Sequence, residues 1–197
     1  MAGGVKINAV RAVASRVRIL GGAYRDAGAW RAADKAVAAV NGGFFDPLHR
    51  PVGLLVSGGK IVSRLSRSHG GVFYTLDSTA HILSADQFAD EDPDDVKEAV
   101  QCGPLLVENH QPNHLKQQYA RRTGIGVQRN GRVVIAVADG AISLPAWAAL
   151  WASSSGLDCV TALNLDGGPS TQLSMQSGQV ALDIRGGWPV PDAVSVR

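Results

Sequence analysis

The chain has 197 residues, of which 45% are hydrophobic and 18% charged, and its formal net charge at pH 7 is +2. This length and composition fit one globular domain with a sizeable core and exclude an intrinsically disordered chain. The small net charge gives no reason to expect a nucleic-acid or membrane-surface partner, and the sequence has no run of about 18 apolar residues that could span a membrane.

In chain order, the first half of the sequence predicts short strands around one helix. The Ala-rich residues 29–38 favour a helix, and an apolar run at 37–40 ends at Asn41-Gly42-Gly43. Turn residues flanked by apolar runs predict antiparallel strand pairs. The strands predicted in this half are 17–20, 52–56 paired with 60–65 around Ser57-Gly58-Gly59, and 72–76 paired with 81–83.

An acidic stretch follows these strands. Residues 86–95 are rich in Asp and contain Pro93, which indicates a solvated loop rather than a buried element. We expect this loop to lead into a short helix near residues 94–100.

The second half predicts a hairpin and several buried strands. Residues 125–128 and 132–138 flank Asn130-Gly131, the turn dipeptide most typical of hairpins. Further apolar, strand-like runs occur at 105–107, 160–165 and 180–184.

A second helix is predicted near residue 150. Ser143 is a suitable cap for a helix that runs to about Ser155, and Gly156 would end it. One apolar face is made by Leu144, Trp147, Ala148 and Trp151. Because this spacing is helical, we expect the two tryptophans to pack in the core rather than to stack on a sugar.

Strands outnumber helices in this pattern, so the sequence predicts an α+β fold. We expect one domain over residues 1–197, with a mixed or mainly antiparallel β-sheet, several hairpins and a few flanking helices. Residues 1–10 contain Lys6 and lack a continuous apolar core, so they do not resemble a secretory signal peptide. Localisation stays open between a cytoplasmic protein and an exported one whose signal was removed upstream, and the oligomeric state is open as well.

The cysteines and histidines offer little chemistry. Cys102 and Cys159 are far apart and lack metal-ligand spacing, so we expect two small buried side chains, with a disulfide as the alternative and a catalytic thiol disfavoured. His110 and His114 have the spacing of a helical metal pair, but Pro112 between them disfavours that helix. No metal or cofactor site is predicted.

Four segments share one pattern, in which an apolar run meets glycine next to a polar or charged residue. They are Asn41–Asp46, Gln101–Leu105, Arg121–Gly126 and Leu163–Ser170. Glycine lets backbone N–H groups converge on a ligand, which suits phosphate oxygens, and arginine adds a fork of donors. An Asp at a strand end supplies the carboxylate that glycosyl transfer needs. We therefore expect one shared cleft, with an anion site at Arg122 and Gly167-Gly168.

The order of these segments resembles the phosphodiester glycosidase family, which includes the enzyme that uncovers mannose 6-phosphate and many bacterial proteins. The matching motifs are Asn41-Gly42-Gly43-Phe44-Phe45, Gly103-Pro104-Leu105, Arg122-Thr123-x-Ile125-Gly126, Asp139-Gly140 and Asn164-Leu165-Asp166-Gly167-Gly168-x-Ser170. The likeness runs from about residue 33 to the C-terminus. It departs mildly at Gly124, where the family usually has an Ala-like residue, and at Pro169, a place often held by Gly.

The resemblance implies a hydrolase that cleaves the glycosidic bond of a sugar-1-phosphodiester and releases a sugar and a phosphomonoester. Asp166 is the first candidate to act at the reacting carbon, as nucleophile or base, and Asp139 is the second. Arg122 would bind the phosphate, and Asn41 would hold a sugar hydroxyl or the attacking water. The candidate substrate-binding residues are Gly42, Gly43, Phe44, Phe45, Gly103, Pro104, Thr123, Gly167, Gly168 and Ser170.

The expected partner is a sugar-phosphate or glycan substrate, and two other interpretations stay open. A non-catalytic carbohydrate- or cell-wall-glycan-binding domain would use the same pocket without a carboxylate at a reacting carbon. A structural protein would use the glycine segments only as turns, which leaves their order unexplained. The sugar, and retention or inversion at its anomeric carbon, are also open.

Overall fold

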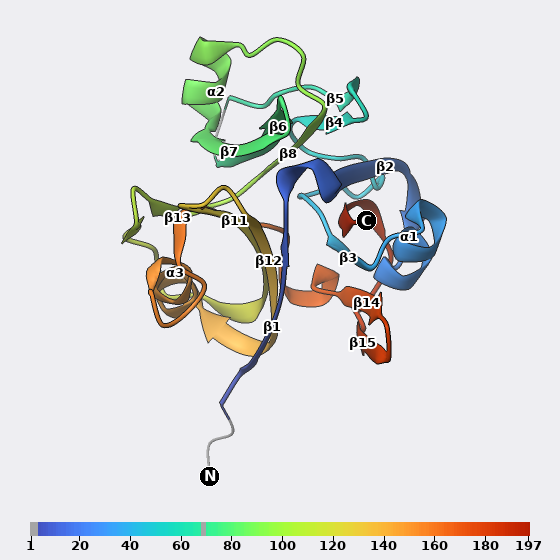
Figure 1. Cartoon of the computed structure of the whole chain (residues 1–197), viewed down its shortest axis with the longest axis vertical. Coiled ribbons are helices and arrows are strands. Elements are labelled where there is room, and N and C mark those ends of the chain that lie inside the picture. Colours follow the sequence, from blue (N-terminus) through green and yellow to red (C-terminus); the bar gives the residue numbers. More distant parts are fainter. Residues whose placement is uncertain (1–3, 68–69) are drawn as a thin grey trace.

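Three antiparallel sheets and three α-helices make up residues 4–67 and 70–197, the part of the chain that the computed structural model describes (Figure 1). All strand pairs are antiparallel, which confirms the expected α+β fold. None of the helices in these residues is long and apolar enough to cross a membrane.

The first sheet has six strands in the order β1-β12-β11-β13-β9-β10. Their bounds are β1 Lys6–Ala12, β9 Leu105–Glu108, β10 Gln111–Pro112, β11 Tyr119–Gln128, β12 Val133–Ser143 and β13 Cys159–Asn164. Helix α3, Leu144–Ala152, packs on this sheet and buries Trp147 and Trp151 completely. The two indoles meet edge to face with ring centroids 5.4 Å apart, so they are core residues as expected.

The second sheet has five strands in the order β15-β14-β3-β16-β2. Their bounds are β2 Val17–Arg25, β3 Ala38–Asn41, β14 Leu173–Ser177, β15 Val180–Ile184 and β16 Val190–Val196. Helix α1, Ala27–Asp34, covers it through the buried Trp30. The helix begins at the Asp26 cap and ends at Lys35, whose φ of 52° is left-handed, so it lies slightly earlier in the chain than the predicted 29–38.

The third sheet also has five strands, in the order β5-β4-β8-β6-β7. Their bounds are β4 Leu55–Ser57, β5 Lys60–Ser63, β6 Gly71–Leu76, β7 Thr79–Ser84 and β8 Glu98–Cys102. Helix α2, Ala85–Glu91, packs against it through Phe88. Short 3-10 helices occur at Ala14–Arg16 and Gly168–Ser170. In Figure 1 this sheet and α2 form the upper part of the molecule, above the other two sheets.

The hairpins expected from turn residues are confirmed. The predicted pairs form as β4 with β5, β6 with β7, and β11 with β12. The predicted start of a helix after Ser143 is confirmed, because the Ser143 hydroxyl accepts a hydrogen bond from Ala146 N–H at 3.3 Å. The helix ends at Ala152, before the expected end near Ser155.

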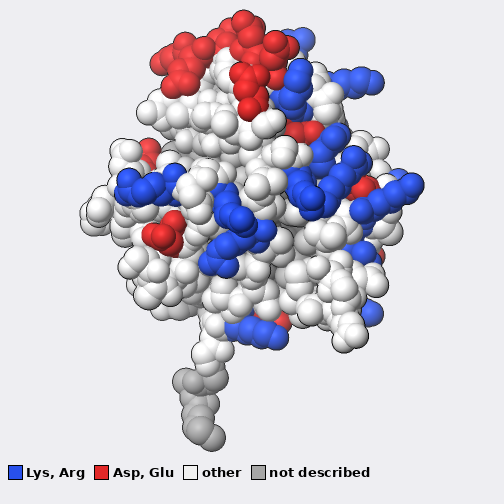
Figure 2. Space-filling model, viewed as in Figure 1, with Lys and Arg blue, Asp and Glu red and all other residues white. Residues whose placement is uncertain are grey.

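The interpretation of residues 86–100 was wrong for residues 86–91 and for the expected helix near 94–100. Residues 86–91 of the acidic stretch lie in helix α2, which Ser84 and Gln87 begin with a reciprocal capping box, and only residues 92–97 form a loop. The expected helix near 94–100 is absent, and strand β8 begins there at Glu98. Figure 2 shows acidic side chains gathered at the top of the molecule, over α2 and the loop that follows it. The helix therefore buries its apolar face while its acidic face stays in water.

Strand β16 was not predicted at all. Every residue from Val190 to Val196 is buried, because β16 lies between β3 and β2. Asp192 and Ser195 interrupt its apolar pattern, so the sequence pattern did not predict a buried strand here. Strands β1 and β14 were also missed.

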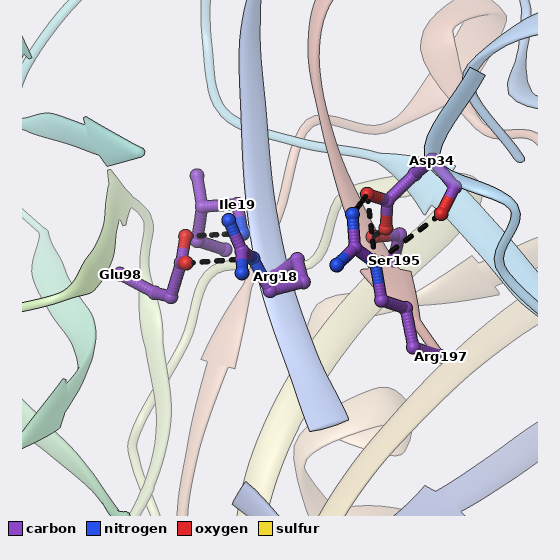
Figure 3. Close-up of polar contacts among 6 residues, drawn as sticks. All are labelled: Arg18, Ile19, Asp34, Glu98, Ser195 and Arg197. Atoms are coloured by element: carbon purple, nitrogen blue, oxygen red, sulfur yellow. Dashed lines mark hydrogen bonds and ion pairs between the residues drawn. The ribbon is translucent and has the colours of Figure 1, made fainter. Parts of the chain in front are cut away.

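Two buried carboxylates tie segments that are distant in sequence (Figure 3). Glu98 on β8 accepts the Ile19 N–H of β2 at 2.8 Å and pairs with Arg18 at 2.8 Å, which joins the second and third sheets. Asp34 at the end of α1 accepts the Ser195 hydroxyl at 2.7 Å and pairs with Arg197. The C-terminal strand is thereby held against α1.

Two glycines of β11 allow α3 to approach the first sheet closely. A Cβ on Gly126 would lie 2.8 Å from Trp151 Cζ3 and 2.9 Å from Cys159 Sγ, and one on Gly124 would lie 2.7 Å from Trp151 Cζ2. Since Trp151 is fully buried, it has no room to move aside.

We therefore expect Gly126→Ala to lower the free energy of unfolding by about 1 to 3 kcal/mol through overpacking. The measurement is chemical denaturation of the variant and the parent. Gly4→Ala is the control, because a Cβ there meets nothing within 4 Å. Equal unfolding midpoints for Gly126→Ala and the parent would contradict the close packing.

Candidate functional site

Three of the four glycine-containing segments meet at the side-chain amide of Asn41, at the end of β3. Asn41 Nδ2 donates to the Asp166 carbonyl at 2.8 Å, and Asn41 Oδ1 accepts the Thr123 hydroxyl at 2.7 Å and the Gln172 N–H at 3.2 Å. The amide is fully buried, so its hydrogen-bonding atoms are taken up by these protein groups. The expectation that Asn41 holds a sugar hydroxyl or water is not met here, and Asn41 instead holds the loops in place.

Backbone hydrogen bonds complete the convergence. The Asp166 N–H donates to Gly42 O at 3.1 Å, and the Leu165 N–H donates to Thr123 O at 2.9 Å. Asn164 connects the second segment, because its side chain donates to Gly103 O at 3.1 Å and its N–H donates to Pro104 O at 3.0 Å. These contacts confirm that segments spread over more than 120 residues come together, while a shared ligand-binding cleft between them stays a prediction.

Asp166 follows β13 and is partly buried where the segments meet. Its carboxylate accepts the Gly167 N–H at 2.8 Å. Burial raises the pKa of Asp166, while hydrogen bonds from the Ser170 hydroxyl and the Gly167 N–H oppose the increase. A carboxylate with a raised pKa beside polar groups is suited to act as a base or a nucleophile.

Asp192 on β16 is a second buried carboxyl group, which the sequence analysis missed. It is 1% exposed, its Oδ1 accepts the Gly43 N–H at 2.6 Å, and its Oδ2 is buried with no hydrogen-bond partner in the described residues. A Cβ on Gly42 would overlap Asp192 Oδ1, which explains the glycine at that position. The one available signal was an Asp inside the apolar run that ends the chain.

The environment of Asp192 favours its protonated form. Burial raises its pKa to about 7, the Gly43 N–H opposes this, and the charge of Asp166 raises it further. Backbone hydrogen bonds place the two residues on either side of Gly42, whose N–H donates to Asp192 O and whose carbonyl accepts the Asp166 N–H, both at 3.1 Å. Asp192 is therefore the member of the pair that keeps its proton up to about neutral pH.

Arg122 on β11 is a buried cation, only 5% exposed. Its Nη2 donates to Gln118 O at 2.5 Å, and its Nε is buried without a partner. Among residues 4–67 and 70–197, Arg122 forms no ion pair. Gly167 faces it, since a Cβ on Gly167 would lie 3.8 Å from Arg122 Nη1. Burial lowers the pKa of Arg122, which reflects the cost of holding this charge without a counter-ion.

Asp139 on β12 lies in a different environment. Its carboxylate forms an ion pair with Arg121 at 3.3 Å, and its side chain is 46% exposed. Arg121 also donates to Arg185 O at 3.0 Å. The two neighbouring arginines therefore differ in environment. Arg121 is paired with Asp139, whereas Arg122 is buried and has no acidic partner in the described residues.

The other predicted substrate-binding residues divide by exposure. Gly42, Gly43, Gly103, Thr123 and Ser170 are buried in the converging loops. Phe44 and Phe45 are partly buried and pack on core clusters, and Pro104 is also partly buried. Gly167 is partly buried, and Gly168, with φ of 58°, has open space at its Cα. Gly168 is therefore the part of the loop best placed to present its backbone to a ligand.

Cys102 and Cys159 are both free and buried, so the disulfide alternative is not realised and the expected buried thiols are confirmed. Burial raises the pKa of both thiols, which keeps them protonated and unreactive. In the described part of the chain, no group of three or more His, Cys, Asp or Glu side chains is arranged to hold a metal ion.

Comparison with known proteins connects this geometry to one family. The family model described as phosphodiester glycosidase matches residues 34–197. An uncharacterised Escherichia coli K12 protein, YigE, is 31% identical over 111 residues, which cover 49% of this chain and 42% of that protein. The matched region thus spans less than half of that relative.

Solved structures show the same fold at low sequence identity. The zebrafish N-acetylglucosamine-1-phosphodiester alpha-N-acetylglucosaminidase catalytic domain, auto-inhibited by its pro-peptide, has a TM-score of 0.73 and 16% identity, over 98% of this chain and 83% of that one. A hypothetical protein from Synechocystis has a TM-score of 0.72 and 18% identity, over 100% of this chain and 60% of that one.

The raised pKa of Asp192 predicts a pH-dependent stability difference. The folded chain keeps this proton to about pH 7, whereas the unfolded chain releases it near the ordinary aspartate pKa of 3.8. The contribution of Asp192 to the free energy of unfolding therefore falls as pH rises from about 4 to about 7. Asn cannot ionise and still accepts the Gly43 N–H, so Asp192→Asn gains stability over the parent across this window, about 4 kcal/mol at pH 8.

Chemical denaturation of both proteins between pH 4 and pH 8 measures this difference. Asp90→Asn, an exposed carboxylate on α2, is the matched control and leaves the curve of the parent unchanged. Parallel curves for Asp192→Asn and the parent would show that the carboxyl group is not desolvated.

Proposed function

The chain belongs to the phosphodiester glycosidase family, and from that premise we propose that it hydrolyses sugar-1-phosphodiesters. Water attacks the anomeric carbon, the bond from this carbon to the bridging phosphate oxygen breaks, and the oxygen leaves with the phosphate. The products are a free sugar and a phosphomonoester. The expected partner is thus a sugar-phosphate or glycan substrate.

One observation carries this proposal, the buried guanidinium of Arg122 without an acidic partner. A buried charge is costly unless an opposite charge or several hydrogen bonds compensate it. Arg122 has one hydrogen bond, to Gln118 O, and its Nε has no partner in the described residues. A phosphate oxygen would supply the missing charge, and the planar guanidinium fork suits phosphate.

The backbone beside Arg122 supports the same ligand. Gly167 lies against the guanidinium, and Gly168 begins a short 3-10 helix with open space at its Cα. The Gly167, Ser170 and Thr171 N–H groups donate within the loop and Pro169 has no N–H, so Gly168 supplies the N–H that this turn can offer to an anion. Because a phosphomonoester leaves as a stable anion, the site needs charge stabilisation more than a strong acid.

Asp166 is the proposed group at the reacting carbon. Its charge would stabilise the oxocarbenium-like centre, either as nucleophile or as the base for water. Asp192 supports this role, because a neighbour that stays protonated below about pH 7 leaves the negative charge on Asp166. Asp139 remains the second candidate, although it is half exposed and paired with Arg121. Among the other predicted binding residues, the partly exposed Phe44, Phe45, Pro104 and Gly168 would contact the substrate, and the buried ones would hold the loops that present them.

Release of sugar from a panel of synthetic sugar-1-phosphodiesters tests the function directly. Turnover of at least one diester is expected, with sugar and phosphomonoester in equal amounts. Binding of the same compounds without turnover would instead support a non-catalytic glycan-binding domain.

Asp166→Asn is expected to lower kcat by about a thousandfold while the fold survives. Asn keeps the hydrogen bond from Gly167 N–H but cannot carry the stabilising charge. The measurement is kcat on the best diester, with circular dichroism to verify folding. Asp139→Asn is the comparison, and a larger loss there than in Asp166→Asn would move the catalytic role to Asp139.

Arg122→Gln is expected to lower kcat/KM for the diester by about a hundredfold, because it removes the positive charge at the phosphate. Inorganic phosphate should raise the melting temperature of the parent and have a smaller effect on the variant. Arg121→Gln is the matched control, since Arg121 is already paired with Asp139 at the surface. Equal phosphate effects on parent and Arg122→Gln would contradict an anion site at Arg122.

A further inference from the structure

A second feature adjoins the loop that carries Asp166. It is a cavity of about 570 Å³ between the start of α1, strands β14 and β15, and residues 185–189. Its polar and aromatic lining includes Asp26, Gln172, Ser174, Asp183, Arg185 and Trp188. Cavities of roughly 300 to 1,000 Å³ hold small organic ligands, so one or two sugar rings would fit.

Trp188 gives this cavity an aromatic wall. It is 46% exposed, whereas Trp30 is 4% exposed and Trp147 and Trp151 are fully buried. The indole is fixed, because its Nε1 donates to the Ser170 hydroxyl at 3.3 Å and its backbone carbonyl accepts from Gln172 Nε2 at 3.2 Å. A fixed, exposed indole offers a flat apolar surface at little cost in conformational entropy.

The wall is connected to the proposed catalytic carboxylate through one side chain. The Ser170 hydroxyl, 2% exposed, accepts from Trp188 and also forms the hydrogen bond that lowers the pKa of Asp166. The Gly187 N–H donates to Pro169 O at 2.6 Å and fastens the cavity rim to the same loop. Trp188 and Asp166 therefore flank one short loop, which places the cavity next to the reaction site.

The polar lining indicates the class of ligand. Asp183 and Arg185 are exposed, and within the described residues neither forms an ion pair. Asp26 adds a second carboxylate, which caps α1 through the Ala29 N–H. Two carboxylates disfavour a phosphate here, whereas sugar hydroxyl groups can donate to the carboxylates and accept from Arg185. The aromatic wall would cover the apolar face of the same ring.

We propose that this cavity is a subsite for a second sugar unit of the substrate, which stacks on Trp188 and forms hydrogen bonds with Asp183 and Arg185. This inference rests on the proposed function, because it places the second unit beyond the phosphodiester that Asp166 and Arg122 act on. Trp188 is then a specificity determinant for long substrates over short ones.

A binding experiment tests the subsite without turnover. Iodide quenches exposed tryptophan, so quenching in Asp166→Asn reports mainly on Trp188. The long probe is N-acetylglucosamine 1-phosphate esterified to the 6-hydroxyl of methyl glucoside, and the short probe is its methyl ester. The long probe is expected to protect Trp188 from iodide, and the short probe to protect it less. Equal protection, or none, would overturn the subsite.

Kinetics of the two diesters give the second readout. Trp188→Ala is expected to raise KM for the long diester about tenfold more than for the short one. Trp188→Phe keeps an aromatic surface without the N–H and should retain most of the preference. A Trp188→Ala variant that treats both diesters alike would overturn the subsite. If the parent cleaves neither diester, the proposed function fails, and the quenching result still decides on the subsite.

Discussion

The side-chain amide of Asn41 bonds to Thr123, Asp166 and Gln172, and the arrangement of the candidate site depends on it. It donates to the Asp166 carbonyl and accepts from Thr123 and Gln172, so it links the second sheet to β11 and to the loop after β13. A buried amide left without partners costs about 1 to 3 kcal/mol. Separating these loops would break the hydrogen bonds of the buried amide, and this free-energy cost holds the loops together.

Close backbone approach around this amide follows from the glycines. Gly42 lies where any side chain would overlap Asp192, and a Cβ on Gly43 would lie 2.8 Å from the Gln101 carbonyl. The segments can meet at these distances because they lack side chains there. Their N–H groups then bond to carboxylates, as Gly43 does to Asp192 and Gly167 does to Asp166. The glycines thus contribute to the site indirectly, because the close approach that they permit brings the charged side chains near one another.

The charged groups at the site, Asp166, Asp192 and Arg122, differ in how far they are exposed to water. This difference supports the proposed reaction. Asp192 and Arg122 are buried, and each has a polar atom without a partner in the described residues. Asp166 is only partly buried and keeps two hydrogen bonds from its own loop. Desolvation destabilises the two buried groups in their charged forms, so a bound anion at Arg122 and a proton on Asp192 both relieve a cost already present in the fold.

Local pattern determined much of the structure. The hairpin at Asn130-Gly131, the cap at Ser143 and the glycine segments could be predicted, because turns, caps and helical periodicity involve neighbours in sequence. The capping box that begins α2 is local as well, but the acidic composition concealed it.

Tertiary structure alone decided the rest. Glu98 is in a strand because its charge is met by the Ile19 N–H, 79 residues away, and Asp192 is buried against the Gly43 N–H, 149 residues away. From sequence alone, a carboxylate is predicted to be exposed to solvent. The group that compensates its burial is distant in sequence and comes close only when the sheets pack.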